Sequence, residues 1–435
     1  REMSRWIVIA LFAGACGAPS TPDAGPPPPP VDAGTDAGEA PLVPDIVCPG
    51  GPDCADVGDG MLRVGAAAAT ITPSFDSVDA ITVDVDGDGQ FDPEDGDEFE
   101  DRNGDGDYDA IWLAGFGNGR GATSILNDTW ARAIALRQNE TTIVLLSLDV
   151  VGFFLDDAVL IREAVADLDI DFVSVSATHV HEGRDTIGIW GATLTESGRD
   201  PAYIAYIQER AEQAIREAVA AIEPANIQYA SLSLRNEPGG VRRYVSDSRD
   251  PFIIDDEVRI LRFARGDETT IATLVNFSAH PEYMGSRNTE LASDFPHWLR
   301  EGIESGVDDP DGLRVEGVGG ICVFVNGALG AQIGPGGVEV QTWGGADVPR
   351  GTMESAATMG SQVAYFVLTA LGPDGGSITE ETAELGVRRA QFFLRIENRR
   401  YHIAFLQGLF VREVFHYDPD LPVRAGVNEP DVLTE

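Results

Sequence analysis

The sequence predicts an α/β fold with a mixed, partly parallel β-sheet core flanked by helices. Three observations predict it. Strand-like and helix-like segments alternate along the chain. Several of the strand-like runs are continuously apolar, which is typical of parallel strands buried on both faces. Other runs alternate apolar and polar residues with a period of two, which favours added antiparallel strands.

The expected elements follow in order from residue 62. Apolar runs predict buried strands at residues 62–73, 141–149, 171–181, 269–281 and 319–330. Period-two alternation predicts strands at 226–236 and 257–265, and the late segments 381–396 and 399–410 also resemble strands. Helical spacing of apolar residues predicts helices at 156–169, 201–222, 293–305 and 355–371.

Residues 1–16 resemble an export signal. Arg5 precedes an apolar run that is too short to span a bilayer. The stretch AGAC, which ends at Cys16, resembles the lipobox of bacterial lipoproteins, in which the cysteine is lipidated. The protein is therefore expected to be exported. It is either a lipoprotein of the bacterial cell envelope, in the periplasm or on the outer-membrane surface, or a secreted protein.

Residues 17–60 form a linker rich in Pro, Ala and Gly that cannot bury a core. Within it, Cys48 and Cys54 bracket a short loop that a disulfide can close in an oxidising compartment. Such a linker after a lipid anchor predicts a domain held at a membrane surface. The formal net charge of −42 argues against nucleic acid as a partner, because an acidic surface repels phosphate.

An acidic insertion at residues 76–110 carries two copies of a calcium-loop pattern. DVDGDGQFDPED places acids at positions 1, 3, 5, 9 and 12 with Gly89 at the turn, and DRNGDGDYD repeats the spacing. Oxygen donors at alternate positions can wrap a hard divalent ion. The predicted donors to structural Ca²⁺ are Asp84, Asp86, Asp88, Asp95, Asp101, Asn103, Asp105 and Asp109. A solvated acidic loop without an ion is the alternative.

Polar side chains stand at the ends of four predicted strands: Asp149, the pair His179 and His181, His280, and Asn326. In open α/β sheets ligands bind beyond the carboxyl ends of strands, so these residues are expected in one crevice. His179 and His181 share strand parity, which predicts both rings on one face. This set of an Asp, a His-x-His pair, a third His and an Asn suits a divalent metal, zinc above all, with an open position for water. Histidines satisfied by ordinary hydrogen bonds are the alternative.

At these residues the sequence resembles the N-terminal catalytic domain of the neutral/alkaline, non-lysosomal ceramidases. The resembling segments are RVGAAAATITP, LAGFGNGRGATSILNDTWARAIAL, SATHVHEG and VNFSAHPEYM with SDFPHWL, between residue 62 and about residue 335. They resemble the family's opening strand, its glycine loop with the start of a helix, its His-x-His motif, and its HP and DFPG motifs. The resemblance implies a ceramidase-like α/β domain over residues 61–435.

The resemblance also implies a zinc centre. His179 and His280 match the family's zinc-binding histidines, and His181 matches the histidine that contacts the substrate and assists catalysis. The expected catalytic residues are His181, Asp149 and Arg184, and the expected substrate-binding residues are Gly117, Asn118, Gly119 and Asn326. The family's other zinc ligands, a Glu and a Tyr, come later, so the chain is expected to be incomplete at its C-terminus. The local substitutes are Glu182, Asp149 and Asp294.

Two departures from the family alter the expected substrate. Ala331 and Ile333 stand where the family has an acid and a serine that amide cleavage requires, and GRDTIGIWG replaces GPGG, so that Arg184 and Trp190 line a differently shaped pocket. The expected function is a surface-anchored, zinc-dependent hydrolase. It would cleave an amide or ester of a small amphipathic or lipid-like substrate through a zinc-bound water.

Two other functions stay open: a non-catalytic calcium-binding surface module with a degraded ceramidase-like site, and a zinc phosphoesterase. The glycine-rich segment 115–121 is open to two interpretations as well. It either shapes the pocket with its backbone N–H groups or forms a plain tight turn.

Overall fold

The computed structural model describes residues 7–8, 45–51 and 57–416, apart from 88, 103, 105, 238, 331, 335, 381–383, 391–395, 397 and 413. The expected lipidation site at Cys16, most of the linker, and the C-terminal residues 417–435 lie outside the described residues. Cys48 is disulfide-bonded, and its expected partner Cys54 also lies outside them. The expectations for these segments remain predictions.

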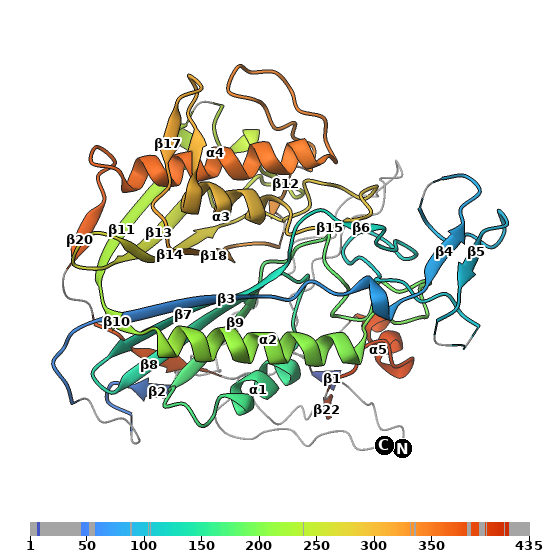
Figure 1. Cartoon of the computed structure of the whole chain (residues 1–435), viewed down its shortest axis with the longest axis horizontal. Coiled ribbons are helices and arrows are strands. Elements are labelled where there is room, and N and C mark those ends of the chain that lie inside the picture. The colour runs from blue at the N-terminus through green and yellow to red at the C-terminus, as the bar shows by residue number, and fades with distance from the viewer. Residues whose placement is uncertain are drawn as a thin grey trace.

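Two five-stranded sheets form the centre of the molecule, and helices cover both outer faces (Figure 1). The first sheet runs in the spatial order β10 (Glu223–Pro224), β3 (Arg63–Thr70), β7 (Trp130–Gln138), β8 (Thr141–Leu148) and β9 (Phe172–Ala177). The second runs in the order β18 (Ile321–Asn326), β14 (Thr270–Phe277), β13 (Glu257–Ala264), β11 (Asn226–Ser233) and β20 (Ile378–Glu380). The predicted mixed α/β class is confirmed, with two sheets in its core.

Each sheet contains one parallel pair. β8 runs parallel to β9, and β14 runs parallel to β18. The other neighbours in both sheets are antiparallel, including the period-two strands β11 and β13. Parallel strands end at the same edge of a sheet, so the loops after β8 and β9 leave the first sheet side by side. The loops after β14 and β18 leave the second sheet in the same way.

The four predicted helices are present with slightly different ends: α1 (Leu155–Ala164), α2 (Pro201–Ala220), α3 (Phe295–Ser305) and α4 (Met353–Leu371). The side chain of Asp200 accepts the N–H of Ala202 and caps α2, and Pro201 follows at the first helical position, where its missing N–H costs nothing. Thr352 caps α4 in the same manner. The starts of α2 and α4 therefore rest on ordinary capping chemistry, whereas α1 begins after Phe154 without a side-chain cap.

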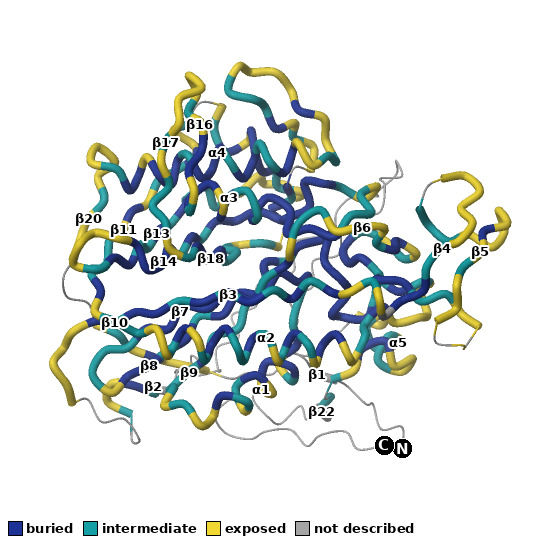
Figure 2. The backbone as a smooth tube through the Cα atoms, in the orientation of Figure 1, coloured by how far each residue is buried: buried dark blue, intermediate teal, exposed yellow. Residues whose placement is uncertain are grey.

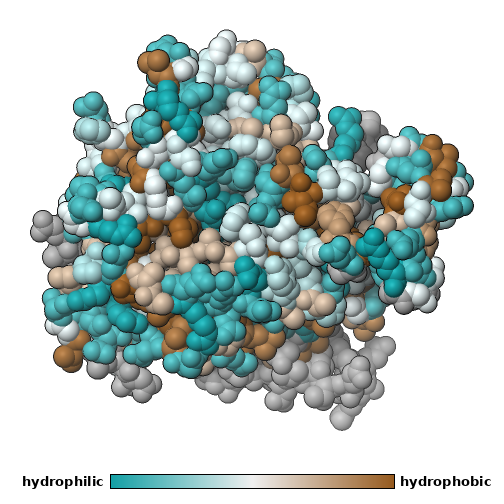
Figure 3. Space-filling model, viewed as in Figure 1, coloured by the Kyte–Doolittle hydropathy of each residue, from teal (hydrophilic) through white to brown (hydrophobic). Residues whose placement is uncertain are grey.

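Three apolar layers hold the four-layer arrangement together. Val64, Ile134, Phe263 and Val323 belong to the cluster formed by residues of both sheets. A second cluster joins the first sheet to α2, and a third joins the second sheet to α3 and α4. Figure 2 shows the buried backbone concentrated in these layers, whereas hydrophilic residues gather over the outer face of α2 (Figure 3). Burial of each large apolar side chain contributes about 1.5–3 kcal/mol.

Two segments differ from their predicted structure. Residues 399–410 were expected as a strand but contain α5 (Arg399–Leu406). Tyr401, Ala404 and Phe405, at helical spacing, pack around Phe410, so a helix places these partly buried side chains on one face. The segment WARAIAL, which the ceramidase resemblance predicted to begin a helix, is instead part of strand β7. Its position between two strands of a buried sheet outweighs the helix propensity of its alanines. Of residues 381–396, only β21 (Val387–Arg389) is a described strand.

The remaining elements are short. They are β1 (Ile7–Val8), β2 (Asp45–Cys48), β4 (Ala80–Val83), β5 (Glu98–Glu100), β6 (Ser124–Ile125), β12 (Ser246–Asp247), β15 (Glu290–Leu291), β16 (Gly306–Asp308), β17 (Arg314–Glu316), β19 (Gln332–Ile333) and β22 (Phe415–His416), with the 3₁₀ turns Phe75–Ser77, Leu234–Asn236 and Val241–Arg243. β4 and β5 form a hairpin in the acidic insertion, at one end of the molecule (Figure 1). None of the described helices is long and apolar enough to cross a bilayer.

Candidate metal centre

Three histidines meet beyond the carboxyl ends of β9 and β14. The ring centroid of His179 lies 5.0 Å from that of His181 and 4.8 Å from that of His280, and the His181 and His280 centroids are 5.7 Å apart. One ligand nitrogen from each ring lies within 4.8 Å of the others. Among the described residues, this is the sole group of three or more His, Cys, Asp or Glu side chains arranged closely enough to hold a metal ion.

The two histidines of the His-x-His motif do not lie on a strand, contrary to the expectation from parity. β9 ends at Ala177, and His179 adopts a left-handed backbone conformation with φ of +67°. This conformation is uncommon for a residue other than glycine. The N–H of His179 donates to the carbonyl of Val150 at 3.0 Å. The rings therefore converge because the chain turns sharply after the strand.

Backbone carbonyls orient two of the three rings. Nδ1 of His179 lies 2.5 Å from the carbonyl oxygen of Val151, and Nδ1 of His280 lies 3.0 Å from that of Gln332. A carbonyl only accepts, so each Nδ1 carries the hydrogen and each Nε2 keeps its lone pair. These two imidazoles therefore have the tautomer in which Nε2 can bind a metal.

His181 is fully buried, and its ring nitrogens have no hydrogen-bond partner within the described part of the chain. Its ring packs edge-on against Phe116, with centroids 4.9 Å apart. A Cβ on Gly115, which has φ of +101°, would lie 2.3 Å from Cγ of His181, so only glycine fits beside the ring. Buried polar atoms without partners are costly. A metal ion would satisfy one of the two nitrogens, so the residues present fit a metal.

Burial keeps all three rings neutral. Burial lowers the pKa of His179 and lowers that of His280 to about 4. It lowers the pKa of His181 well below its usual value. The positive charge that the neighbouring histidines would carry lowers the pKa of His181 further. The neutral imidazole is the form that coordinates metals. The local environment thus prepares the side chains for binding.

Three buried carboxyl groups lie close to the histidines: Glu182, Glu282 and Asp294. Burial raises the pKa of Glu282 to about 8 and that of Asp294 to about 6, and it raises the pKa of Glu182 well above its usual value. Oε2 of Glu282 is 3.4 Å from Nδ1 of His181. The sequence reasoning missed Glu282, whose one signal was its position two residues after His280.

Asn326 ties the two histidine loops together. Its Nδ2 donates to the carbonyl of Thr178 at 2.5 Å, and its Oδ1 accepts the N–H of Ala279 at 3.3 Å. Thr178 precedes His179 and Ala279 precedes His280. The amide therefore joins the edges of the two sheets and sets the spacing of the histidines, whereas the sequence predicted a substrate contact.

The comparisons with known proteins bear on this fold and site. The chain resembles the structure of neutral ceramidase from Pseudomonas aeruginosa at 17% sequence identity and a TM-score of 0.51, over 71% of this chain and 45% of that chain. It resembles a ceramidase complexed with C2 at 16% identity and a TM-score of 0.51, over 71% of this chain and 44% of that one. The fold is ceramidase-like. At this level of identity the likeness concerns the fold alone.

The chain spans less than half the length of either ceramidase structure. No protein-family model matches the sequence, and no curated protein matches it. The similarity to ceramidases is therefore found by comparing three-dimensional structures. At 16–17% identity the comparisons of sequence do not detect it.

In this ceramidase-like fold, the glycine-rich segment forms a wall beside the histidines. Arg120 is buried and donates to the carbonyls of His181 and Ala114. Of the predicted substrate-binding residues, Asn118 donates to the carbonyl of Ile189 at 3.0 Å, and Gly119 donates to that of Gly191 at 2.9 Å. Gly117 is exposed. The segment is thus fastened both to the His181 loop and to residues 189–193.

A groove of about 610 Å³ is lined by residues of the glycine-rich segment and of the acidic insertion. Phe91, Tyr108 and Trp112 line it, together with Gly119 and Gly121 of the glycine-rich segment. The ring centroids of Phe91 and Tyr108 are 4.7 Å apart, so the aromatic residues pack on one another. The groove offers aromatic surface beside the glycine-rich segment.

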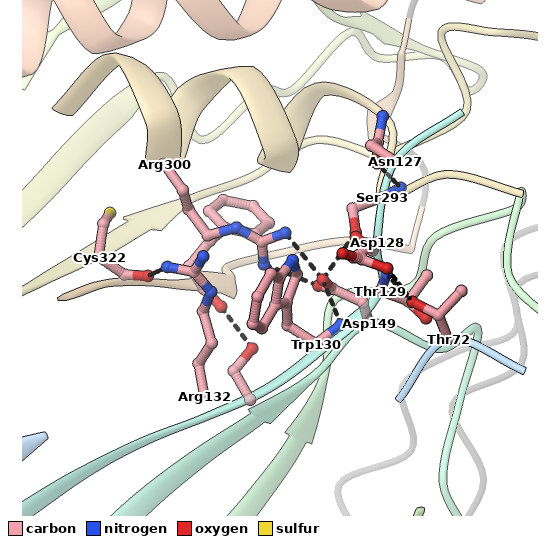
Figure 4. A network of polar contacts seen from close by, with 12 residues as sticks. Thr72, Asn127, Asp128, Thr129, Trp130, Arg132, Asp149, Ser293, Arg300 and Cys322 are labelled. Carbon is pink, nitrogen blue, oxygen red and sulfur yellow. Dashed lines mark hydrogen bonds and ion pairs between the residues drawn. The ribbon is translucent and has the colours of Figure 1, made fainter. Parts of the chain in front are cut away.

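Asp149, an expected catalytic residue, lies in a different network (Figure 4). Its two carboxylate oxygens pair with the Arg300 guanidinium at 2.9 and 2.7 Å. Oδ2 also accepts the Ser293 hydroxyl at 2.8 Å and the N–H of Trp130 at 3.0 Å. These partners satisfy the carboxylate inside the protein, so the geometry gives no support to a catalytic or metal-binding role for Asp149.

Arg184 also has structural partners. Its Nη2 pairs with Asp200, the cap of α2, at 3.0 Å, and its guanidinium stacks over Tyr203 at 5.4 Å from the ring centroid. Both partners belong to the start of α2. The structure therefore attaches Arg184 to that helix, and no described contact joins it to the histidine rings.

The acidic insertion is described only in part, because Asp88, Asn103 and Asp105 lie outside the described residues. Asp84 accepts the N–H groups of Gly87 and Gly89 at 2.7 and 2.9 Å, and Asp101 accepts those of Gly104 and Gly106 at 2.6 and 2.9 Å. The two loops therefore share one local hydrogen-bond pattern. The predicted donors Asp84, Asp86, Asp95, Asp101 and Asp109 form no metal-holding group by themselves. Calcium binding stays a prediction.

Proposed function

We propose that this chain is a metal-dependent hydrolase of ceramidase-like type that cleaves an N-acyl amide or ester bond. The observation that carries the proposal is the convergence of three imidazoles, those of His181 and His280 buried and that of His179 partly buried, with the His181 nitrogens lacking a hydrogen bond among the described residues. The ceramidase-like fold of the neighbours supports the hydrolase class.

In this proposal His179, His280 and His181 hold the ion, and the proposed ion is zinc, for which neutral imidazoles are common ligands. When bound, such an ion supplies Lewis acidity, which lowers the pKa of water and polarises a substrate carbonyl. His181 thus takes the place of a third ligand, in contrast to the catalytic role expected from the resemblance. Its unpartnered nitrogens and full burial favour this assignment.

The protein's own residues shape the site around the ion. Asn326 fixes the spacing of the two histidine loops. Arg120 and Phe116 close one side of His181, which excludes water from the back of its ring. A site held rigid in this way loses little free energy to rearrangement when it binds.

The proposed substrate is small and amphipathic or lipid-like, and the aromatic groove beside the glycine-rich segment is the candidate surface for its apolar part. Ile333, which stands where the family has a serine, lies in β19 and offers no group for proton transfer. Cleavage by this chain would thus differ in detail from that of ceramidases. Surface attachment through Cys16 belongs to the same proposal, because it would hold the site near a lipid surface.

Hydrolysis of chromogenic N-acyl amides and esters by the zinc-loaded full chain tests the proposal. We expect turnover that His280→Ala abolishes and that His297→Ala preserves. His297 is a suitable control because it lies on α3 and pairs with Glu301 at 3.5 Å. Zinc binding without turnover on any amide or ester would instead favour the non-catalytic module, and equal turnover by both variants would refute the assigned site.

A calcium titration tests the acidic insertion separately. We propose a structural role for calcium, so saturating Ca²⁺ should raise the thermal midpoint of unfolding. At a Ca²⁺ concentration of 100 times Kd, binding should add about 2.7 kcal/mol to the free energy of unfolding. The variant Asp84→Asn with Asp101→Asn should lose that gain. An unchanged midpoint in the wild-type chain would show that the insertion is a solvated acidic loop.

A further inference from the structure

His181, the third histidine of the centre, has the carboxyl group of Glu282 beside its Nδ1. We infer that Glu282 is a positioning residue that accepts the Nδ1–H of His181 and so presents Nε2 of His181 to the metal. This inference rests on the proposed metal-dependent function. It assigns a role to a residue that the sequence motifs did not single out.

The other two histidines provide the pattern. His179 and His280 each have Nδ1 held by a backbone carbonyl, that of Val151 and that of Gln332. His181 has no such carbonyl, and the polar group next to its Nδ1 is Oε2 of Glu282, at 3.4 Å. With Glu282 as acceptor, all three imidazoles of the centre have the same tautomer.

Backbone hydrogen bonds hold the side chains of His181 and Glu282 next to each other. The N–H of His181 donates to the carbonyl of Pro281 at 3.1 Å, which places the His181 main chain against the residue before Glu282. The N–H of Glu282 donates to the carbonyl of His280 at 3.1 Å, and the N–H of Gly334 donates to the Glu282 carboxylate. Neither side chain has much freedom, because His181 is 0% exposed and Glu282 is 6% exposed.

The nearby carboxyl groups are less suited to this role. Both oxygens of Asp294 accept backbone N–H groups, from Phe295 at 2.6 Å and from Met284 at 2.9 Å. Glu182 makes no described ion pair with a histidine ring. The set of mutually close ligand atoms consists of the three imidazoles and does not include Glu282. Glu282 is therefore better placed to orient a metal-binding histidine than to bind the metal itself.

The chemical benefit is well defined. A carboxylate that accepts the second N–H of a metal-bound imidazole fixes the orientation of the ring and increases its strength as a donor. Loss of such a partner typically weakens metal binding by about 10- to 100-fold. The positive charge of a bound divalent ion would favour the ionised form of Glu282. Two carbonyls and one carboxylate would then support three neutral imidazoles, and the carboxylate would offset part of the charge of the ion.

Two substitutions separate the hydrogen bond from the charge. Glu282→Leu removes the acceptor, and Glu282→Gln keeps an acceptor oxygen but removes the charge. We expect competition with a chromophoric chelator to show zinc binding weaker by about 10- to 100-fold in E282L and by a smaller factor in E282Q. The control is Glu301→Leu, on the outer side of α3, which should bind zinc as the wild type does.

Nitrogen chemical shifts of the histidine-labelled, zinc-loaded protein provide a readout that a general structural defect would not move. We expect Nδ1 of His181 to be protonated in the wild type and in E282Q. If E282L does not fold, E282Q and these shifts decide the question. Wild-type zinc affinity in E282L, or in E282Q when E282L is unfolded, would overturn the role of Glu282 alone. Absence of zinc binding by the wild type would instead refute the metal centre, and this inference with it.

Discussion

The Asp149 network and the histidine centre lie past the ends of neighbouring parallel strands, yet they have opposite properties. Asp149 follows β8, and the histidine motif follows β9. Asp149 has a guanidinium, a hydroxyl and a backbone N–H as partners (Figure 4). His181 is as deeply buried, but Nε2 of its ring has no hydrogen-bond partner within the described chain, and beside its Nδ1 lies the Glu282 carboxyl group at 3.4 Å.

This difference teaches how a buried polar residue at a strand end is to be interpreted. A polar group with its hydrogen bonds complete inside the protein joins elements together. A buried polar group without partners carries a desolvation cost that a ligand can relieve. The sequence shows the same pattern in both places, so the partners found in three dimensions distinguish a structural crosslink from a site.

The largest effect is expected from breaking the Asp149 network. Arg300→Met leaves the Asp149 carboxylate buried without its counter-charge, so the free energy of unfolding should fall by about 3–5 kcal/mol. Urea unfolding of the metal-free protein measures it. The double variant Arg300→Met with Asp149→Leu should recover much of the loss, because both charges are then gone. Zinc affinity should stay at the wild-type value in each folded variant. A large loss of zinc affinity with little loss of stability would place Asp149 in the metal centre.

A smaller effect is expected within the histidine centre, at Asn326. Asn326→Leu leaves the carbonyl of Thr178 and the N–H of Ala279 without a partner, so stability should fall by about 1–3 kcal/mol. The histidine loops also lose their crosslink, so zinc affinity should fall by about 10-fold. Urea unfolding and chelator competition on one preparation measure both quantities. Unchanged zinc affinity in the destabilised variant would show that Asn326 holds the sheets without positioning the histidines.

The smallest effect concerns Cys322, whose carbonyl accepts from Arg132 at 2.9 Å beside the Asp149 network. Burial raises the pKa of this thiol from 9.0 to about 12. Between these values an unfolded chain releases the thiol proton while the folded chain keeps it, so stability should decline as pH rises through that window. Native protein at pH 9 should resist iodoacetamide at Cys322, and urea should expose it, as peptide mass spectrometry can show. Rapid labelling of the native chain would show that this region opens more easily than its burial implies.

Much of the fold could be predicted because local patterns agree with it. The helix α2 combines a capping Asp200, an N-terminal Pro201 and a continuous apolar face. The strands β8, β14 and β18, near whose ends Asp149, His280 and Asn326 stand, are largely apolar runs. The division into two sheets could not be predicted, because periodicity identifies strands without giving their partners. The α5 helix was missed because its apolar face is short and packs on Phe410, a contact outside the helix itself.

The site was predicted in part. The three histidines could be found because imidazoles at strand ends form a recognisable pattern, although the turn at His179 that brings the rings together is a tertiary feature. The roles of Asp149 and Asn326 depend on partners far away in sequence, Arg300 and Thr178. Glu282 carries no motif, and only the position of His181 makes it relevant.

The most direct test of the central claim is the stoichiometry and affinity of zinc on the purified full chain after removal of calcium. The account predicts one tightly bound equivalent in the wild type and in His297→Ala, and weakening by more than about 100-fold in His179→Ala and in His280→Ala, because loss of a ligand exceeds the loss of a ligand's partner. Wild-type affinity in both ligand variants, or no binding by the wild type, would contradict it.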